Sequence, residues 1–133
     1  MNKKNTIWIT AGIINLFTAL LHTIGGQIDL VNSLLNSDLS DQVKTEWLGV
    51  WHMITVVLFA TSYYLIRSGL SKTKFPNSGI IKSIGAIYVL FSLSFIFSSI
   101  ITQNFAPQWI LLLPIGILAI WGIKGIEITT AQY

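Results

Sequence analysis

Two histidines lie inside apolar stretches of the sequence, and they are the residues best suited to carry chemistry. His22 belongs to the stretch LHTIGG at residues 21–26, and His52 ends the stretch WLGVWH at residues 47–52. A neutral imidazole can ligate a metal, accept a proton or hydrogen-bond a ligand. Ionisable residues inside a membrane span are costly, so each one is by default a hypothesis for a functional site. We therefore predict a site built around this pair.

Helical spacing places each histidine on a polar stripe. On a period of 3.6 residues, one stripe contains Asn15, Thr18, His22 and Asp29, and the other contains Thr45, His52, Thr55, Phe59 and Ser62. An unpaired polar group is costly in lipid, so the two stripes are expected to face each other from neighbouring helices. The sequence thus predicts that the two imidazoles meet at one depth of the membrane.

One chemistry open to such a pair is ligation of haem b. Bis-histidine ligation needs one imidazole from each of two helices, and small residues where the macrocycle packs. Three glycines lie near enough to serve, namely Gly25, Gly26 and Gly49.

A second chemistry is binding of a single transition metal, because imidazole suits zinc, copper, iron and nickel. Two histidines are too few ligands for a transition-metal ion, so a carboxylate has to complete the coordination. Glu46 lies about 120° away from His52 around the helix. The predicted metal set is therefore His22, His52 and Asp29.

The third chemistry is a small-molecule pocket in which one histidine accepts a proton and tryptophans form the walls. The candidate ligand-binding residues are His22, His52, Trp47, Trp51, Asn15, Thr55 and Tyr88. The same pocket would serve a membrane enzyme that acts on a lipid-soluble substrate with a histidine as general base.

A purely structural role is the alternative to all three. A neutral imidazole can bridge two helices by hydrogen bonds worth about 0.6 to 2 kcal/mol. The chain would then be a structural or accessory subunit of a membrane complex, without a ligand site. The residue types do not decide between these functions.

The elements that must position these residues are membrane spans. The chain is 53% hydrophobic and 10% charged, whereas an average soluble domain is about 25% charged. It has too few solvating groups to cover a water-soluble globule. There are no cysteines, which excludes disulfides, thiolate metal sites and cysteine nucleophiles. The sequence also contains no Gly-rich phosphate loop, H-E-x-x-H or G-x-S-x-G pattern.

The apolar runs predict an all-α membrane protein, a single domain over residues 1–133 formed by an antiparallel bundle of four transmembrane helices. The spans are expected at about 6–24, 46–66, 79–102 and 107–123. Between the first two, acidic and amide side chains interrupt the apolar run, while Ile28, Val31 and Leu35 recur at helical spacing. This pattern predicts a partly helical outer loop of about 20 residues that lies on the membrane surface and can cover the histidine pair.

Basic residues predict the orientation. With the N-terminus inside, all of the eight Lys and Arg residues except Lys44 fall on the cytoplasmic side. We therefore expect a multi-pass protein of the plasma (inner) membrane with both termini cytoplasmic. Because topology accounts for the net charge of +3, we exclude nucleic acid as a partner. The expected partners are the lipid bilayer, a small apolar ligand, and a second copy or a larger membrane protein.

The L-H-x-x-x-G pattern at Leu21, His22 and Gly26, followed one helix later by Trp51 and His52, resembles a group of small bacterial four-helix membrane proteins without known function. The resemblance covers about the first half of the chain. It implies the four-helix fold and nothing about activity.

Overall fold

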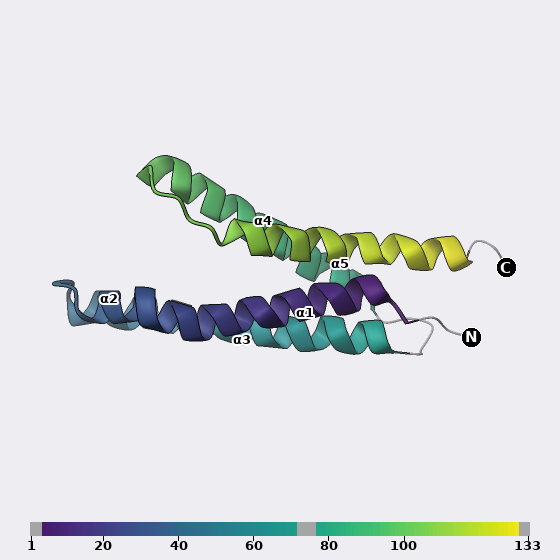
Figure 1. Cartoon of the computed structure of the whole chain (residues 1–133), viewed down its shortest axis with the longest axis horizontal. Helices are drawn as coiled ribbons and strands as arrows, with labels where there is room; N and C mark the ends of the chain where they lie inside the picture. Colours follow the sequence, from purple (N-terminus) through teal and green to yellow (C-terminus); the bar gives the residue numbers. More distant parts are fainter. Residues whose placement is uncertain (1–3, 72–76, 131–133) are drawn as a thin grey trace.

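The computed structural model describes residues 4–71 and 77–130, with the backbone alone for residues 124–130. In the described residues all regular structure is helical, and it forms four rods in two antiparallel hairpins (Figure 1). The first rod is continuous and consists of α1 (Thr6–Leu20), two π-helical turns, η1 (Leu21–Gly25) and η2 (Gln27–Val31), and α2 (Asn32–Leu35). The other three rods are α3 (Asp41–Leu70), α4 (Ser78–Thr102) and α5 (Trp109–Thr130). The predicted all-α fold is confirmed.

Three of the rods are long and apolar enough to cross a membrane. They are Thr6–Leu35, Asp41–Leu70 and Ser78–Thr102, and a shorter apolar stretch covers Trp109–Ile123 of α5. The starts of α1 and α4 and the ends of α3 and α5 lie at one end of the molecule (Figure 1). The fourth span, and the side of the membrane that this end occupies, remain predictions.

The outer loop predicted between the first two spans is wrong in its extent. The helix continues through Gly25 and Gly26. Gly26 is helical with φ −68°, and no glycine in the described residues has the positive φ that often ends a helix. Only residues 36–40 connect the two rods. Lys44 closes the turn by donating from Nζ to the carbonyl of Leu35 at 3.0 Å. No long loop is therefore left to cover the histidines.

Ser40 caps the N-terminus of α3. Its side chain accepts a hydrogen bond from the backbone N–H of Val43 at 3.5 Å, and Asp41 occupies the first turn. A serine N-cap with an acidic first turn complements the unpaired N–H groups and the dipole of the helix. The helix thus begins several residues before the apolar span.

α1 is the central helix, and polar groups fasten its first turns to the neighbouring helices. Trp8 is fully buried, and its indole N–H donates to the carbonyl of Ala119 in α5 at 3.1 Å. Asn5, which caps α1, donates from its side chain to the carbonyl of Gly122 at 2.8 Å, and from its backbone to that of Gly69 at 2.9 Å. These bonds hold α1, α3 and α5 together at the end of the bundle where α1 starts.

Glycines allow close approach within each hairpin. A Cβ on Gly12 of α1 would lie 2.6 Å from Cγ1 of Ile66 in α3, and one on Gly116 of α5 would lie 2.8 Å from the carbonyl oxygen of Gly85 in α4. Small residues that bring backbones together are the usual means by which membrane helices pack. Each hairpin is therefore a tightly packed pair.

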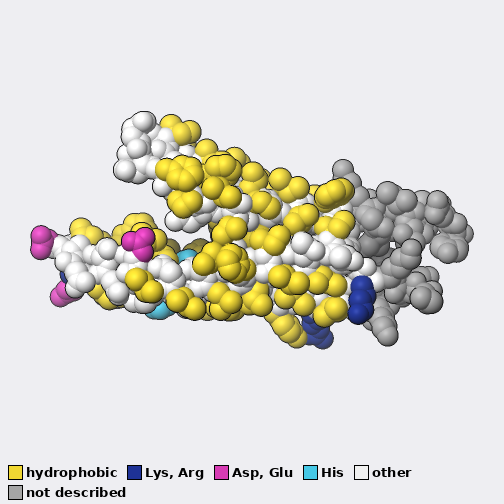
Figure 2. Space-filling model, in the orientation of Figure 1, with side chains coloured by type: hydrophobic (Ala, Val, Ile, Leu, Met, Phe, Trp, Pro, Cys, Tyr) yellow, Lys and Arg dark blue, Asp and Glu magenta, His cyan; other side chains and the backbone are white. Residues whose placement is uncertain are grey.

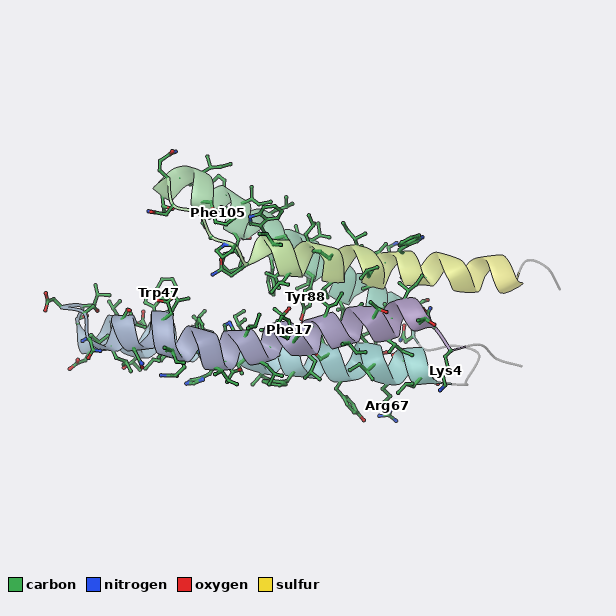
Figure 3. All side chains as sticks on the ribbon, in the orientation of Figure 1. Lys4, Phe17, Trp47, Arg67, Tyr88 and Phe105 are labelled. Carbon is green, nitrogen blue, oxygen red and sulfur yellow. The ribbon has the colours of Figure 1, made fainter. Side chains whose placement is uncertain are left out.

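The two hairpins separate at the end opposite the helix-fastening bonds (Figure 1). The space-filling view shows a hollow there (Figure 2). We call it the notch: it opens between Trp47 on the first hairpin and Phe105 on the second, and closes toward Tyr88 (Figure 3).

Candidate functional site

A ring of three polar side chains lies at the closed end of the notch. Asn15 of α1 donates from Nδ2 to Thr61 Oγ1 of α3 at 2.8 Å, and Tyr88 of α4 donates from its hydroxyl to Asn15 Oδ1 at 2.9 Å. A contact of 2.6 Å between the Thr61 and Tyr88 hydroxyls completes the ring. The second N–H of the amide has the carbonyl of Leu58 at 3.2 Å. Three helices are therefore joined by a polar network in which every member has a partner.

Two of the predicted ligand-binding residues belong to this ring and are engaged within the protein. Asn15 and Tyr88 are both fully buried, and their hydrogen-bonding groups bond to the protein itself. Sequence reasoning missed Thr61, because it lies half a helical turn away from the stripe that contains His52. Its depth was the available signal, since the antiparallel hairpin brings residue 61 level with residue 15.

The ring of His22, in η1 of the first rod, stacks on the indole of Trp51 in α3. The ring centroids are 3.8 Å apart and the planes differ by 16°. The imidazole Nε2 lies 3.4 Å from the backbone carbonyl of Trp51, and a carbonyl can only accept, so Nε2 carries the proton in this contact. In the described residues Nδ1 has no hydrogen-bond partner. The half-buried imidazole thus keeps a free acceptor.

The backbone around His22 is also unusual. His22 lies within η1, and η2 follows directly after Gly26. π-helical turns are rare and occur frequently at functional sites. A Cβ on Gly26 would overlap the Trp51 ring, whereas one on Gly25 would meet nothing within 4 Å. Gly26 therefore leaves the room that the Trp51 indole needs to reach His22.

His52 does not join this cluster. It is exposed, and no hydrogen bond, ion pair or ring contact connects it to another described residue. It follows Trp51 in α3 and therefore points about 100° away from it around the helix. Figure 2 shows the two histidine side chains at separate places, one beside the notch and one at the far edge of the first hairpin. The predicted meeting of the imidazoles is not found.

The predicted metal set of His22, His52 and Asp29 is likewise not brought together. Among the described residues, no three His, Asp or Glu side chains are placed to hold a metal ion. Asp29 is exposed in η2, and each π turn takes in about one residue more than an α turn, which rotates Asp29 off the stripe of His22. Haem ligation by the pair would require the same meeting of imidazoles.

The remaining predicted site residues lie on α3. The hydroxyl of Thr55 donates to the carbonyl of Trp51 at 3.0 Å, so it shares the acceptor that His22 approaches. Trp47 is 60% exposed and stands at the rim of the notch (Figure 3). Thr55 thus supports the His22 contact, while Trp47 remains available to a ligand.

Gln108 is a second residue that sequence reasoning missed. Its side-chain oxygen is buried without a hydrogen-bond partner in the described part of the chain. It stands two turns before the fully buried Ile115 and four turns before Gly122, which packs on Trp8, so these residues share the face of α5 turned toward the first hairpin. Its only signal in the sequence was an amide at the start of an apolar helix.

The geometry has to carry the functional argument. Comparisons of the chain with models of protein families, with curated proteins and with solved structures each return no match.

Proposed function

We propose that this chain is an integral membrane protein that binds a lipid-soluble molecule in the notch, with His22 holding the polar end of the ligand. The observation that carries the proposal is the state of the His22 ring. One face is stacked on Trp51 and Nε2 is directed at a carbonyl, which leaves Nδ1 as an oriented acceptor. A side chain fixed in this way binds with little loss of rotamer entropy.

The polar groups favour a ligand that brings hydrogen-bond donors. Nδ1 of His22 is an acceptor, and Oε1 of Gln108 is a buried acceptor without a partner among the described residues. A buried acceptor without a donor costs about 1–3 kcal/mol. A hydroxyl group would relieve this cost, so the ligand class that fits best is a lipid-soluble alcohol or phenol.

The walls of the notch favour entry from the bilayer. Trp47 is 60% exposed and Phe105 is 71% exposed at its two rims. Such walls suit an apolar ligand body, with the few polar groups fixing its orientation. By the distribution of basic residues the notch would open to the outer leaflet.

The experiment compares the molecules that copurify with three forms of the protein. His22→Phe keeps an aromatic ring that can stack on Trp51 but removes the acceptor, and His52→Phe is the matched control at the exposed position. Each form is purified in the same detergent, extracted with organic solvent and analysed by mass spectrometry. We expect a hydroxylated species that is enriched in the wild type and in His52→Phe and is lost in His22→Phe.

Identical extracts from all three forms would refute the proposal. Loss of the species in both variants would also count against it, since His52 is exposed and has no contact with the His22–Trp51 pair in the described residues. Thermal melting of each variant separates loss of ligand from loss of fold.

An enzymatic role for His22 is not part of this proposal. A histidine base is usually oriented by a third group such as a carboxylate. Among the described residues the polar contact of His22 is with the carbonyl of Trp51. The membrane enzyme with a histidine base remains a prediction.

A further inference from the structure

The exposed side of α3 carries a regular seam that nothing in the described part of the chain covers. Its six positions alternate in steps of four and three residues and are all exposed: Thr45, Gly49, His52, Val56, Phe59 and Tyr63. We call them the His52 seam. Steps of four and three are the heptad spacing of helices that pack in a left-handed pair at about +20°. The spacing is therefore that of a surface that receives a parallel helix.

We propose that the His52 seam is the interface through which two copies of this chain form a parallel dimer in the membrane, with His52 of each copy hydrogen-bonded to the other. Copies of one membrane protein share one orientation, so a two-fold axis lies along the membrane normal and pairs each residue with itself. This places the two imidazoles at the same depth.

The chemistry of His52 selects a second copy over other occupants. A neutral imidazole has one donor and one acceptor, so two of them form an N–H to N bond without any further group. In the described residues His52 has no partner of its own. The hydroxyls of Thr45 and Tyr63 are bonded within α3, so a pair of His52 rings would also fix the register, because any slip would leave both rings unpaired.

Gly49 supplies the space for this contact. It lies one turn before His52 on the same seam, and a Cβ built there meets nothing within 4 Å. Glycine at a helix contact allows close backbone approach in membranes. In the separate chain no described residue packs against this position, whereas in the dimer it would admit the facing helix.

The charge at the other end of the seam does not oppose this arrangement. Arg67 lies beside the seam, about 22 Å along α3 from His52. It donates to the hydroxyl of Tyr63 at 3.1 Å, and its guanidinium lies 5.9 Å from the centre of the Tyr63 ring. The cation is thus held on its own chain and is exposed near the end of α3, where water and salt would screen repulsion between copies.

Cysteine cross-linking tests the interface directly, because the chain has no native cysteine. Val56→Cys lies on the seam, and Val50→Cys is the matched control on another face of α3; the two valines are 66% and 50% exposed. The full-length variants are placed in lipid vesicles and oxidised with copper phenanthroline. We expect a disulfide-linked dimer of Val56→Cys and a monomer of Val50→Cys.

Two further substitutions in the Val56→Cys chain test the mechanism. Gly49→Leu should abolish cross-linking while leaving the monomer folded, and Gly25→Leu, also at an open glycine but off the seam, should not. His52→Ala should weaken association on the order of tenfold, measured by single-molecule photobleaching over a series of protein-to-lipid ratios. Equal cross-linking of both valine variants, insensitivity to Gly49→Leu, or a wild type that stays monomeric at all ratios would overturn the proposal.

Discussion

Gly26 lies directly against the indole of Trp51, so closely that a Cβ at this position would overlap the ring. The same indole stacks on His22 at 3.8 Å. A glycine without a side chain thus sets the position of the aromatic ring that in turn orients the imidazole. The order of dependence is Gly26, then Trp51, then His22, and it can be tested at each step.

Substituting the two adjacent glycines should give opposite results. Gly26→Ala should destabilise the protein by about 1–3 kcal/mol, because the new methyl group displaces the Trp51 ring. Gly25→Ala should stabilise the protein by about 0.5–1 kcal/mol through helix propensity, because the added Cβ would meet no other described residue within 4 Å. Reversible unfolding in mixed micelles, followed by circular dichroism, measures both. Equal effects of the two substitutions would contradict the contact.

The three members of the polar ring at the closed end of the notch should contribute non-additively to stability. Tyr88→Phe leaves Asn15 Oδ1 without its donor in a buried site, so a loss of about 1–2 kcal/mol of unfolding free energy is expected. The triple variant Asn15→Leu, Thr61→Val, Tyr88→Phe removes donors and acceptors together. Its loss of unfolding free energy should be smaller than the sum of the losses in the three single variants. Unfolding of the wild type and the four variants measures both.

Removing the indole N–H should destabilise the protein at the buried Trp8 but not at the exposed Trp121. Replacing Trp8 by 1-naphthylalanine, which is similar in size but has no N–H, leaves the carbonyl of Ala119 without that donor. The expected cost is about 1 kcal/mol. The same replacement at Trp121, which is 58% exposed, should have little effect. Thermal unfolding of both proteins would test the assignment, and equal melting temperatures would count against it.

The helical architecture was predictable because several local signals agree. Apolar runs coincide with the three rods that are long enough to span a membrane, and a serine N-cap followed by an acidic residue, Ser40 and Asp41, marks the start of α3. The extent of the first rod was not predictable in the same way. Two adjacent glycines and several polar residues usually end a helix, yet here the backbone passes through both glycines in π turns.

The site was only partly predictable for a related reason. Helical periodicity assumes a constant 3.6 residues per turn, so the π turns put Asp29 out of register with His22. The stripe that contained His52 does not lie on one face: Thr45, His52 and Phe59 are exposed, whereas Thr55 is half-buried and Ser62 is buried. The neighbouring Trp51 packs on His22 and Gly26 of the first rod instead, and a tryptophan next to a histidine in sequence gives no sign of which of the two turns inward.

Removing the side-chain amide of Gln108 should raise the stability of the protein and lower its ligand content. Its buried side-chain oxygen has no partner in the described residues, so Gln108→Leu, which is similar in size, should stabilise the ligand-free protein by about 1 kcal/mol. The same substitution should reduce the amount of the copurifying hydroxylated molecule, because the ligand loses one acceptor. Gln42→Leu is the control, since Gln42 is exposed and donates to Glu46 at 2.6 Å. Melting temperature and extract composition are measured on the same preparations. A destabilised Gln108→Leu variant with unchanged ligand content would show that this amide packs within the protein and takes no part in the notch.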